Sequence, residues 1–198
     1  MKKGKIIVLS GPSGSGKTTL YKKLLTDKRM KAPMVKTVSF TTRQKRTGER
    51  HGRDYFFVSS KMFRYKKRKG HFLETEEVFG CHYGTPKKNV LDSLRAGKNV
   101  LLCIDVKGAR TIRKVFPNAL TVFVKTPSLR ALEKRLKKRG SEDPDIRKRR
   151  LQTAREELKE IKKYDHVIVN DDLQAAYRRL KELIKKELER VSAKKKNP

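Results

Sequence analysis

The chain of 198 residues has few cysteines, few acidic residues and no long apolar run. Its two cysteines, Cys81 and Cys103, make neither a disulfide framework nor a zinc-ligand spacing, which favours a reducing compartment. No apolar run approaches the roughly 18 residues that a membrane-spanning helix needs. Residues 1–3 lead directly into a short apolar run without a targeting segment. We therefore expect a cytoplasmic protein with no membrane partner.

Acidic residues are scarce, since 21 Asp and Glu stand against 53 Lys and Arg, a formal net charge of +32. Such an excess permits nonspecific binding of nucleic acid, and the basic runs 64–69, 147–150 and 194–196 are candidate contacts to a phosphate backbone. Most runs of this kind are solvated faces, as we expect for Arg147 and Arg149. Because no stacking or groove-reading motif is recognisable, nucleic acid is not a required partner, and a basic nucleic-acid-binding protein is an alternative function.

The strongest pattern that is present is a P-loop, whose residues are Gly11, Pro12, Ser13, Gly14, Ser15, Gly16, Lys17 and Thr18. It follows an apolar run at 6–9 and precedes helical spacing over 18–25. Small residues after a buried strand let successive backbone N–H groups face one concavity, and a helix N-terminus points at the same anion. The pattern predicts an ATP site that includes Thr19, with Lys17 on the β and γ phosphates and Thr18 on Mg²⁺.

Short apolar runs alternate with helical patterns along most of the chain. The runs lie at 5–9, 99–104, 120–124 and 166–169, and the helical patterns at 87–95, 109–115, 128–138, 150–162 and 173–189. This alternation predicts an α/β protein with a parallel sheet core flanked by helices.

Two regions break the alternation. Residues 35–84 are rich in Thr, Arg, Tyr, Phe and Gly, with strand-like pieces at 55–58 and 72–75, and they indicate an inserted lobe. Residues 139–145 interrupt two arginine-rich helical patterns and indicate a hinged lid. We expect a core with the P-loop at 1–33, the lobe at 34–85, core again at 86–126, a lid region at 127–150, and core with the C-terminal helix at 151–198.

The lobe carries side chains that suit a second phosphorylated substrate. Arg43 and Arg46 offer planar forks that match the paired oxygens of a phosphate, and the Tyr55 hydroxyl completes the set. Farther along the chain, Glu74 adds a carboxylate and Tyr83 another phenol.

These residues resemble the guanylate kinase family. The signature Thr-Thr-Arg-x-x-Arg-x-Gly-Glu-x-x-Gly-x-Asp-Tyr is complete from Thr41 to Tyr55, and Phe-Leu-Glu, Tyr-Gly-Thr, Ile-Asp-Val-x-Gly-Ala and Val-x-Asn-Asp follow in family order. The resemblance implies a P-loop nucleoside monophosphate kinase fold with an inserted mixed GMP-binding lobe and a helical lid. It also implies Mg²⁺-dependent transfer of the γ-phosphoryl group of ATP to GMP, or dGMP, giving ADP and GDP. A catalytically silent scaffold relative is an alternative, although such relatives lose the phosphate loop.

The resemblance also implies roles for individual residues. The phosphate of GMP would be held by Arg43, Arg46, Tyr55 and Tyr83, and guanine would be read by Ser39, Glu74, Thr85 and Asp105. Glu49 would either belong to the GMP site or neutralise Arg46 or Arg50 and shape the loop. The lid arginines Arg135, Arg139 and Arg150 would close over the phosphates and act in catalysis with Lys17 and Arg43. Asn170 would lie beside adenine, while Asp172 is a candidate helix cap.

Two residues depart from the family pattern. Cys103 stands where an acid is usual, which leaves a second protein ligand for Mg²⁺ in doubt, and we expect a buried apolar thiol there. Lys107 replaces a usual glutamine. We expect structural or surface positions for His51 and His71, because phosphoryl transfer to a phosphate needs no histidine base.

Overall fold

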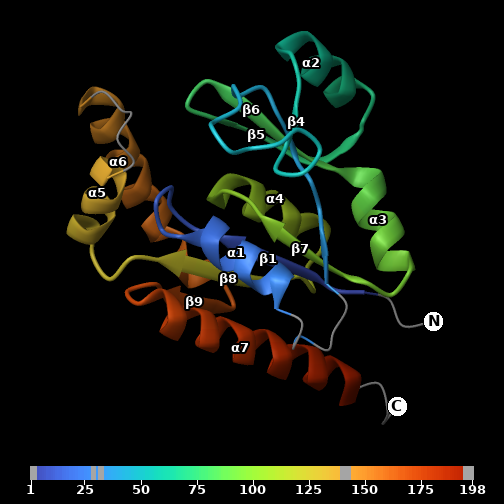
Figure 1. Ribbon diagram of the computed structural model, residues 1–198. Coiled ribbons are helices and arrows are strands. Elements are labelled where there is room, and N and C mark those ends of the chain that lie inside the picture. Colours follow the sequence, from blue (N-terminus) through green and yellow to red (C-terminus); the bar gives the residue numbers. More distant parts are fainter. Residues whose placement is uncertain (1–3, 28–29, 31–33, 139–143, 194–198) are drawn as a thin grey trace.

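The computed structural model describes residues 4–27, 30, 34–138 and 144–193 (Figure 1). Its elements, in chain order, are β1 (Ile6–Ser10), α1 (Lys17–Thr26), β2 (Met34–Lys36), β3 (Phe40–Thr41), β4 (Phe56–Phe57), α2 (Ser60–Arg68), β5 (Phe72–Val78), β6 (Cys81–Pro86), α3 (Lys87–Arg95), β7 (Asn99–Cys103), α4 (Val106–Val115), β8 (Leu120–Lys125), α5 (Leu129–Lys138), α6 (Pro144–Lys159), the 3-10 helix η1 (Ile161–Lys163), β9 (His166–Val169) and α7 (Leu173–Ala193). None of the described helices is both long and apolar enough to cross a bilayer.

The core is a parallel sheet of five strands in the order β2-β7-β1-β8-β9, which confirms the predicted fold class. Every residue of the central strand β1 is buried. Because side chains alternate along a strand, Ile7 and Leu9 point to one face of the sheet and Ile6 and Val8 to the other. The core strands are therefore covered on both sides, as parallel sheets require.

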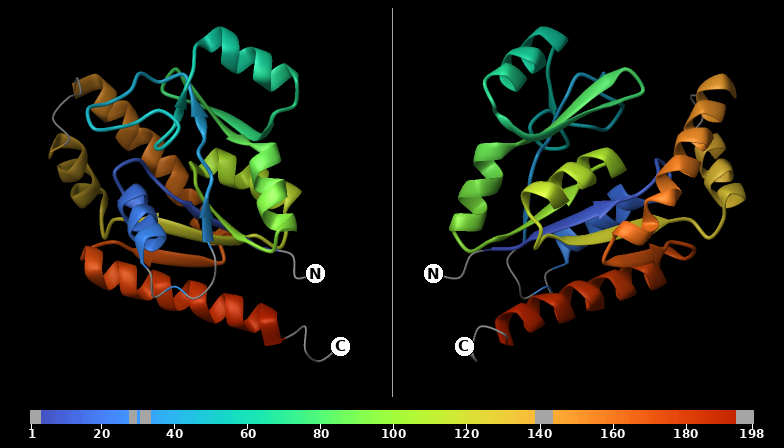
Figure 2. Two further views of the ribbon diagram at one scale, coloured as in Figure 1. Left: turned by 45° about the vertical axis from the view of Figure 1, so that its right-hand side comes forward. Right: turned by 180° about the vertical axis from the view of Figure 1, so that it is seen from behind.

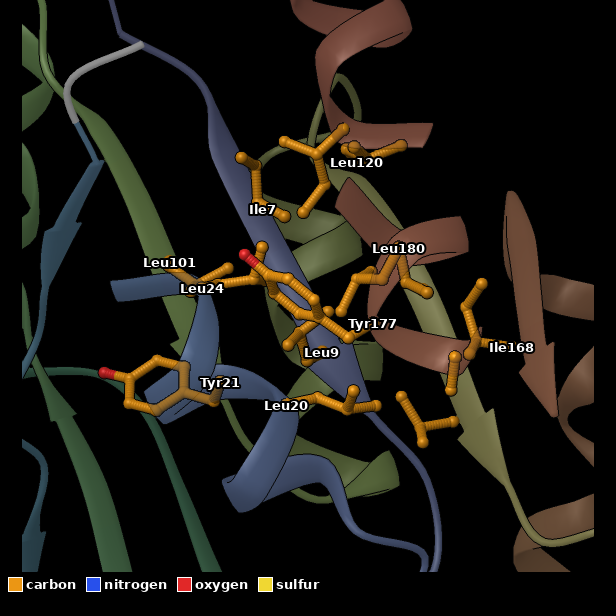
Figure 3. Close-up of a cluster of buried hydrophobic side chains, with 14 residues drawn as sticks. Ile7, Leu9, Leu20, Tyr21, Leu24, Leu101, Leu120, Ile168, Tyr177 and Leu180 are labelled. Carbon is orange, nitrogen blue, oxygen red and sulfur yellow. The ribbon is translucent and has the colours of Figure 1, made fainter. Parts of the chain in front are cut away.

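Helices cover the two faces of this sheet. Leu20 and Leu24 of α1 and Leu180 of α7 pack on the Ile7 face (Figure 3). Residues of α3 and α4 pack on the opposite face, with Ile112 completely buried. Figures 1 and 2 show α7 on one side of the sheet, and the segment from β3 to β6 with α2 on the other.

A second sheet of four strands, in the order β4-β3-β6-β5, forms the lobe. Aromatic stacking holds it together: Phe40 stacks on Phe56, and Phe63 of α2 stacks on Phe72. The expected lobe boundary at residue 34 needs a correction, because β2 pairs in parallel with β7 and belongs to the core sheet. The lobe sheet begins at β3, after the chain has left the core.

Helices α5 and α6 form a pair at the end of the molecule opposite α3 (Figures 1 and 2). Leu132 and Leu136 of α5 pack against Ala154 of α6. The predicted helix over 150–162 is wrong at both ends, since α6 begins at Pro144, η1 follows it, and proline is tolerated in a first helical turn. Residues 139–143 of the predicted lid turn, Arg139 among them, lie outside the described residues, whereas 144 and 145 form the start of α6.

Candidate active site

A cavity of about 340 Å³ opens between the carboxyl ends of β1 and β7, the lobe sheet and α6. This is the edge at which open α/β sheets bind ligands. It brings together most of the predicted site residues, which are Gly11, Ser13, Lys17, Thr18, Ser39, Arg43, Arg46, Glu49, Tyr55, Glu74, Tyr83, Asp105 and Arg150. We call the side formed by residues 11–18 the P-loop end, and the side formed by the lobe the arginine end.

At two positions of the P-loop end, the backbone conformation and the close neighbours require glycine. Gly11 and Gly16 have φ angles of 133° and 91°. A methyl group on Gly11 would overlap the carbonyl oxygen of Val124, and one on Gly16 would overlap the Asn170 amide. These two glycines let the loop curl tightly between β1 and α1, and the curl is closed by a hydrogen bond from Ser15 N to the Pro12 carbonyl at 3.1 Å.

Lys17 lies at the first turn of α1 and is tied to the loop. Its Nζ donates to the carbonyl oxygens of Gly11 and Pro12, the latter at 2.9 Å. The cation is thus held at the cavity wall, and an incoming phosphate has to compete with two carbonyls for it.

Three oxygen groups line the cavity near the P-loop and suit Mg²⁺. Thr18 offers a hydroxyl, and Glu157 and Asp105 offer carboxylates. No cluster of three or more His, Cys, Asp or Glu side chains that could hold a metal occurs in the described part of the chain. Mg²⁺ usually takes one or two protein oxygens and fills its shell with water and substrate phosphates.

Cys103 is half-buried and lines this part of the cavity, which corrects the expectation of a buried thiol. Desolvation raises the pKa of its thiol, although Lys17 and a hydrogen bond with Thr18 act in the opposite direction. A protonated thiol is a poor ligand for Mg²⁺, so any metal-binding carboxylate must come from another residue.

At the arginine end, the Nη2 of Arg43 donates to both carboxylate oxygens of Glu49, at 2.8 and 2.9 Å. Glu49 also accepts from the backbone N–H of Arg46 at 2.9 Å. Burial acts to lower the pKa of the Arg43 guanidinium, but the hydrogen bond to Glu49 and the interactions with Tyr83 together outweigh it and raise that pKa. Glu49 therefore shapes the loop, which agrees with one of the two alternatives for this residue. Its side chain pairs with Arg43, where Arg46 or Arg50 was expected.

Two tyrosines lie beside this ion pair. The rings of Tyr55 and Tyr83 meet edge to face at 6.0 Å, and the Arg43 guanidinium lies 5.6 Å from the Tyr55 ring centre. Burial raises the pKa of Tyr55, so its phenol stays protonated and can donate a hydrogen bond. The arrangement presents a cation and two hydroxyls to the same space.

Glu74 is the buried carboxylate of the arginine end, with 5% of its surface exposed. Its pKa is raised to about 7 by burial, with a further contribution from Asp105, while a hydrogen bond from the Thr85 hydroxyl lowers it. Gly108 of α4 packs so closely that a methyl group there would meet the second carboxylate oxygen of Glu74. Asp105 caps α4, because its Oδ1 accepts from Gly108 N at 2.8 Å.

Some predicted residues lie behind the cavity wall. Asn170 donates its side-chain amide to the Ser15 carbonyl at 2.8 Å, and Arg135 donates to the carbonyls of Asn170 and Asp171 at 2.7 and 3.3 Å. These two residues brace the P-loop from the side of β9. The others that do not line the cavity are Pro12, Gly14, Ser15, Gly16, Thr19 and Thr85.

Several smaller predictions also have outcomes. Asp172 caps α7 by accepting from Ala175 N at 2.7 Å, as predicted. His51 accepts from a backbone N–H at 3.3 Å and His71 is exposed, which confirms their structural and surface positions. Arg149 is exposed as expected, whereas Arg147 is half-buried.

The sequence reasoning missed the cavity residues Val78, Phe79, Ile104, Thr153 and Glu157. Of these, Glu157 carries a charge, and burial raises its pKa to about 7. Lys17 opposes that shift and Asp105 adds to it, which places Glu157 within electrostatic reach of both. Helical spacing from Arg150 puts Thr153 and Glu157 on the same face of α6, and that spacing was the available signal.

Known proteins are similar to this chain in sequence and in fold. The family model described as guanylate kinase matches residues 3–187. A guanylate kinase from Trichormus variabilis is 45% identical over 173 residues, 87% of this chain and 85% of that protein. One from Carboxydothermus hydrogenoformans is 42% identical over 176 residues, 89% of this chain and 85% of that protein.

A solved structure agrees with these sequence matches. The guanylate kinase of Anaplasma phagocytophilum superposes with a TM-score of 0.77 at 34% identity, covering 94% of this chain and 87% of that one. The chain belongs to the guanylate kinase family.

Proposed function

We propose that this chain transfers the γ-phosphoryl group of ATP to GMP, giving ADP and GDP. The observation that carries the proposal is one cavity with a complete P-loop at one end and, at the other, the buried carboxylate of Glu74 beside the arginine of a phosphate clamp. Neither half by itself selects this reaction. Together they fit a donor with a triphosphate and an acceptor with a base that offers hydrogen-bond donors.

The arginine end would bind GMP. Guanine presents N1–H and the 2-amino group side by side, and the Glu74 carboxylate can accept from both, while the Ser39 hydroxyl and the capping Asp105 lie along the same wall. Adenine lacks that pair of donors and would leave the buried carboxylate without hydrogen bonds from the base. Arg43 and Arg46, with the two phenols, would hold the phosphate.

The P-loop end would bind the triphosphate of ATP. Loop N–H groups and Lys17 would face the β and γ phosphates, and Asn170 would act indirectly by bracing the loop. Thr18 would hold Mg²⁺, with Glu157 and Asp105 as carboxylates for its water shell. When bound, Mg²⁺ neutralises charge on the transferring phosphate.

The acceptor oxygen of GMP is already ionised near neutral pH, so the protein needs no general base. Its residues align the two nucleotides, exclude water and spread positive charge over the transferring group. Arg150 lines the cavity and would supply positive charge to the transferring phosphate. Arg135 would first have to leave the carbonyls of the turn after β9. We propose Arg139 as the further lid arginine.

The two separate sheets support the expected domains. The core would bind ATP, the lobe would bind GMP, and α5 and α6 would form the lid. We also propose that the protein works in the cytoplasm, because both cysteines are free thiols.

A coupled assay of ADP release with GMP, AMP, CMP and UMP as acceptors tests the function. We expect turnover that depends on GMP and is far slower with the other three. Absence of GMP-dependent turnover would refute the proposal. In that case tight RNA binding at physiological salt would favour the nucleic-acid alternative, and GMP binding without turnover would favour the scaffold alternative.

A further inference from the structure

The tip of the β5–β6 hairpin has an unusual residue in a demanding conformation. Val78 pairs with Cys81, so Phe79 and Gly80 form a two-residue turn. Their φ angles are 51° and 74°, the positive pair that a type I′ turn requires. Asn, Asp or Gly normally occupies the first of these positions, because a bulky side chain there is strained.

Phe79 is the one non-glycine residue with a positive φ in the part of the chain that the structure describes. Its ring is not buried in a core, since 43% of its surface is exposed. Hydrophobic packing therefore does not account for a phenylalanine at this strained position. Strained residues that persist in a fold often serve a functional site, so the surroundings of the ring are informative.

The ring contacts an arginine from a different part of the molecule. The Arg150 guanidinium of α6 lies 4.9 Å from the centre of the Phe79 ring, within the range of a cation–π interaction. The same guanidinium reaches the Ser13 hydroxyl of the P-loop at 3.4 Å. In Figures 1 and 2 the hairpin points towards α6, so this contact joins the lobe, the lid helix and the P-loop.

We propose that Phe79 is a positioning residue for Arg150. The ring at the hairpin tip holds the guanidinium over the P-loop, where the transferring phosphate has to lie. Because Phe79 lies in the turn that joins β5, which carries Glu74, to β6, which carries Tyr83, a movement of the lobe would move the ring and with it Arg150. The strain of the turn is retained because the smaller residues that would relieve it have no ring.

This inference rests on the proposed phosphorylation of GMP and makes a specific kinetic prediction. Phe79 acts on Arg150 and not on guanine, so its loss lowers kcat and leaves the KM for GMP within about twofold. We expect Phe79→Asn to lower kcat about 3- to 30-fold, the range that corresponds to losing a cation–π contact. The same variant relieves the turn and raises the melting temperature by about 2–4 °C.

Opposite changes in activity and stability separate positioning from a merely structural role. Phe79→Leu keeps a strained apolar residue without the ring and should lose kcat without gaining stability, whereas Phe79→Tyr should retain kcat. Tyr65→Leu is the matched control, because it removes another exposed aromatic ring, on α2, and should leave kcat unchanged. In an Arg150→Met background, which removes the cation, Phe79→Asn should cause little further loss.

Three results would overturn the inference: wild-type kcat in Phe79→Asn, equal losses of kcat with and without Arg150, or a parallel fall of kcat and melting temperature in every Phe79 variant. If the unaltered protein itself shows no GMP-dependent turnover, the proposed function fails as well. Active wild-type protein with unaffected Phe79 variants would overturn the positioning role alone.

Discussion

The P-loop end of the cavity rests on a strand that is buried throughout, whereas the arginine end rests on strands that are mostly half-buried. In the described part of the lobe, Phe63 is the one buried hydrophobic residue, while Thr41, Glu74 and Thr85 are buried polar residues. The first end is held by hydrophobic burial on both faces of a parallel sheet. The second is held by aromatic stacking, ion pairs and hydrogen bonds.

This difference matches what each end has to recognise. Backbone N–H groups at the P-loop bind phosphate oxygens whatever base they carry, so a rigid loop on a buried core is sufficient there. Selection of one base requires side chains with placed acceptors, and these are found in the lobe. A lobe with little hydrophobic core also belongs to the part of a protein that moves most easily, which suits closure over a substrate.

Lys17→Ala tests the comparison most severely. Removing the cation from the P-loop should lower kcat about 10³-fold or more, because positive charge at the transferring phosphate is lost. GMP binding, which belongs to the other end, should change little. ADP release measures the first effect and titration calorimetry with GMP the second. Loss of GMP binding as well would show that the two ends are not independent.

Glu74→Gln tests the arginine end. The amide cannot accept two hydrogen bonds from guanine as a carboxylate does, so kcat/KM for GMP should fall about 10²- to 10³-fold while the KM for ATP is unchanged. Glu77→Gln is the matched control, because Glu77 is an exposed acid on the same strand. An equal effect of both variants would mean that net charge, and not recognition of guanine, sets the affinity.

The same Glu74→Gln variant should be more stable than the unaltered protein at high pH. The folded-state pKa of Glu74 is about 7 against an ordinary 4.5, so the folded protein retains a proton that the unfolded chain releases. The contribution of Glu74 to the stability of the unaltered protein is therefore fully present below pH 4.5, falls as the pH rises towards 7, and is lost above it. The variant should gain roughly 3 kcal/mol in unfolding free energy at pH 8 and almost nothing at pH 4.

Thermal or denaturant unfolding of the two proteins across this pH range measures the effect. Glu77→Gln should show no such pH-dependent gain. A gain that is equal at pH 4 and pH 8 would contradict the assignment, because it would come from packing and not from the charge of a buried carboxylate.

The parallel core could be predicted from the sequence because its signals are local. The apolar runs of β1, β7, β8 and β9 each stand out from their neighbours in the chain. β2 and β6 were missed for a physical reason: β2 is short and pairs with β7, and β6 contains Gly84 and Pro86 and pairs with strands on both of its sides. The strand β7 lies far from β2 in the sequence, and β3 lies far from β6, so no local pattern reports these two pairings. The strand β5 adjoins β6 through a two-residue turn, but Gly84 and Pro86 are residues that strands disfavour.

The site residues, too, could be predicted where the sequence signal is local. Residues 11–18 are contiguous, and the family signature from Thr41 to Tyr55 is nearly so, and both were predicted. Glu157 and Phe79 lie in segments without a phosphate-binding or base-reading pattern and enter the cavity through the packing of α6 and the turn of a hairpin. Arg135 and Asn170 were assigned to ligands, but their side chains hold backbone carbonyls around the P-loop.

Glu157→Gln is the smallest test and the one that sharpens the comparison most. The P-loop end otherwise binds phosphate through backbone N–H groups and Lys17, and Glu157 would add a carboxylate to it. Glu157 lines the cavity together with Cys103, the thiol at the position where the family pattern has an acid. If it serves the water shell of Mg²⁺, the variant should need about 10-fold more Mg²⁺ for half-maximal turnover. Calorimetric binding of ATP should weaken with Mg²⁺ present and not in its absence, whereas Glu156→Gln, an exposed neighbour paired with Lys159, should change neither. Equal weakening with and without Mg²⁺ would mean that Glu157 holds Lys17 in place, and the P-loop end would then depend on side-chain ion pairs as the arginine end does.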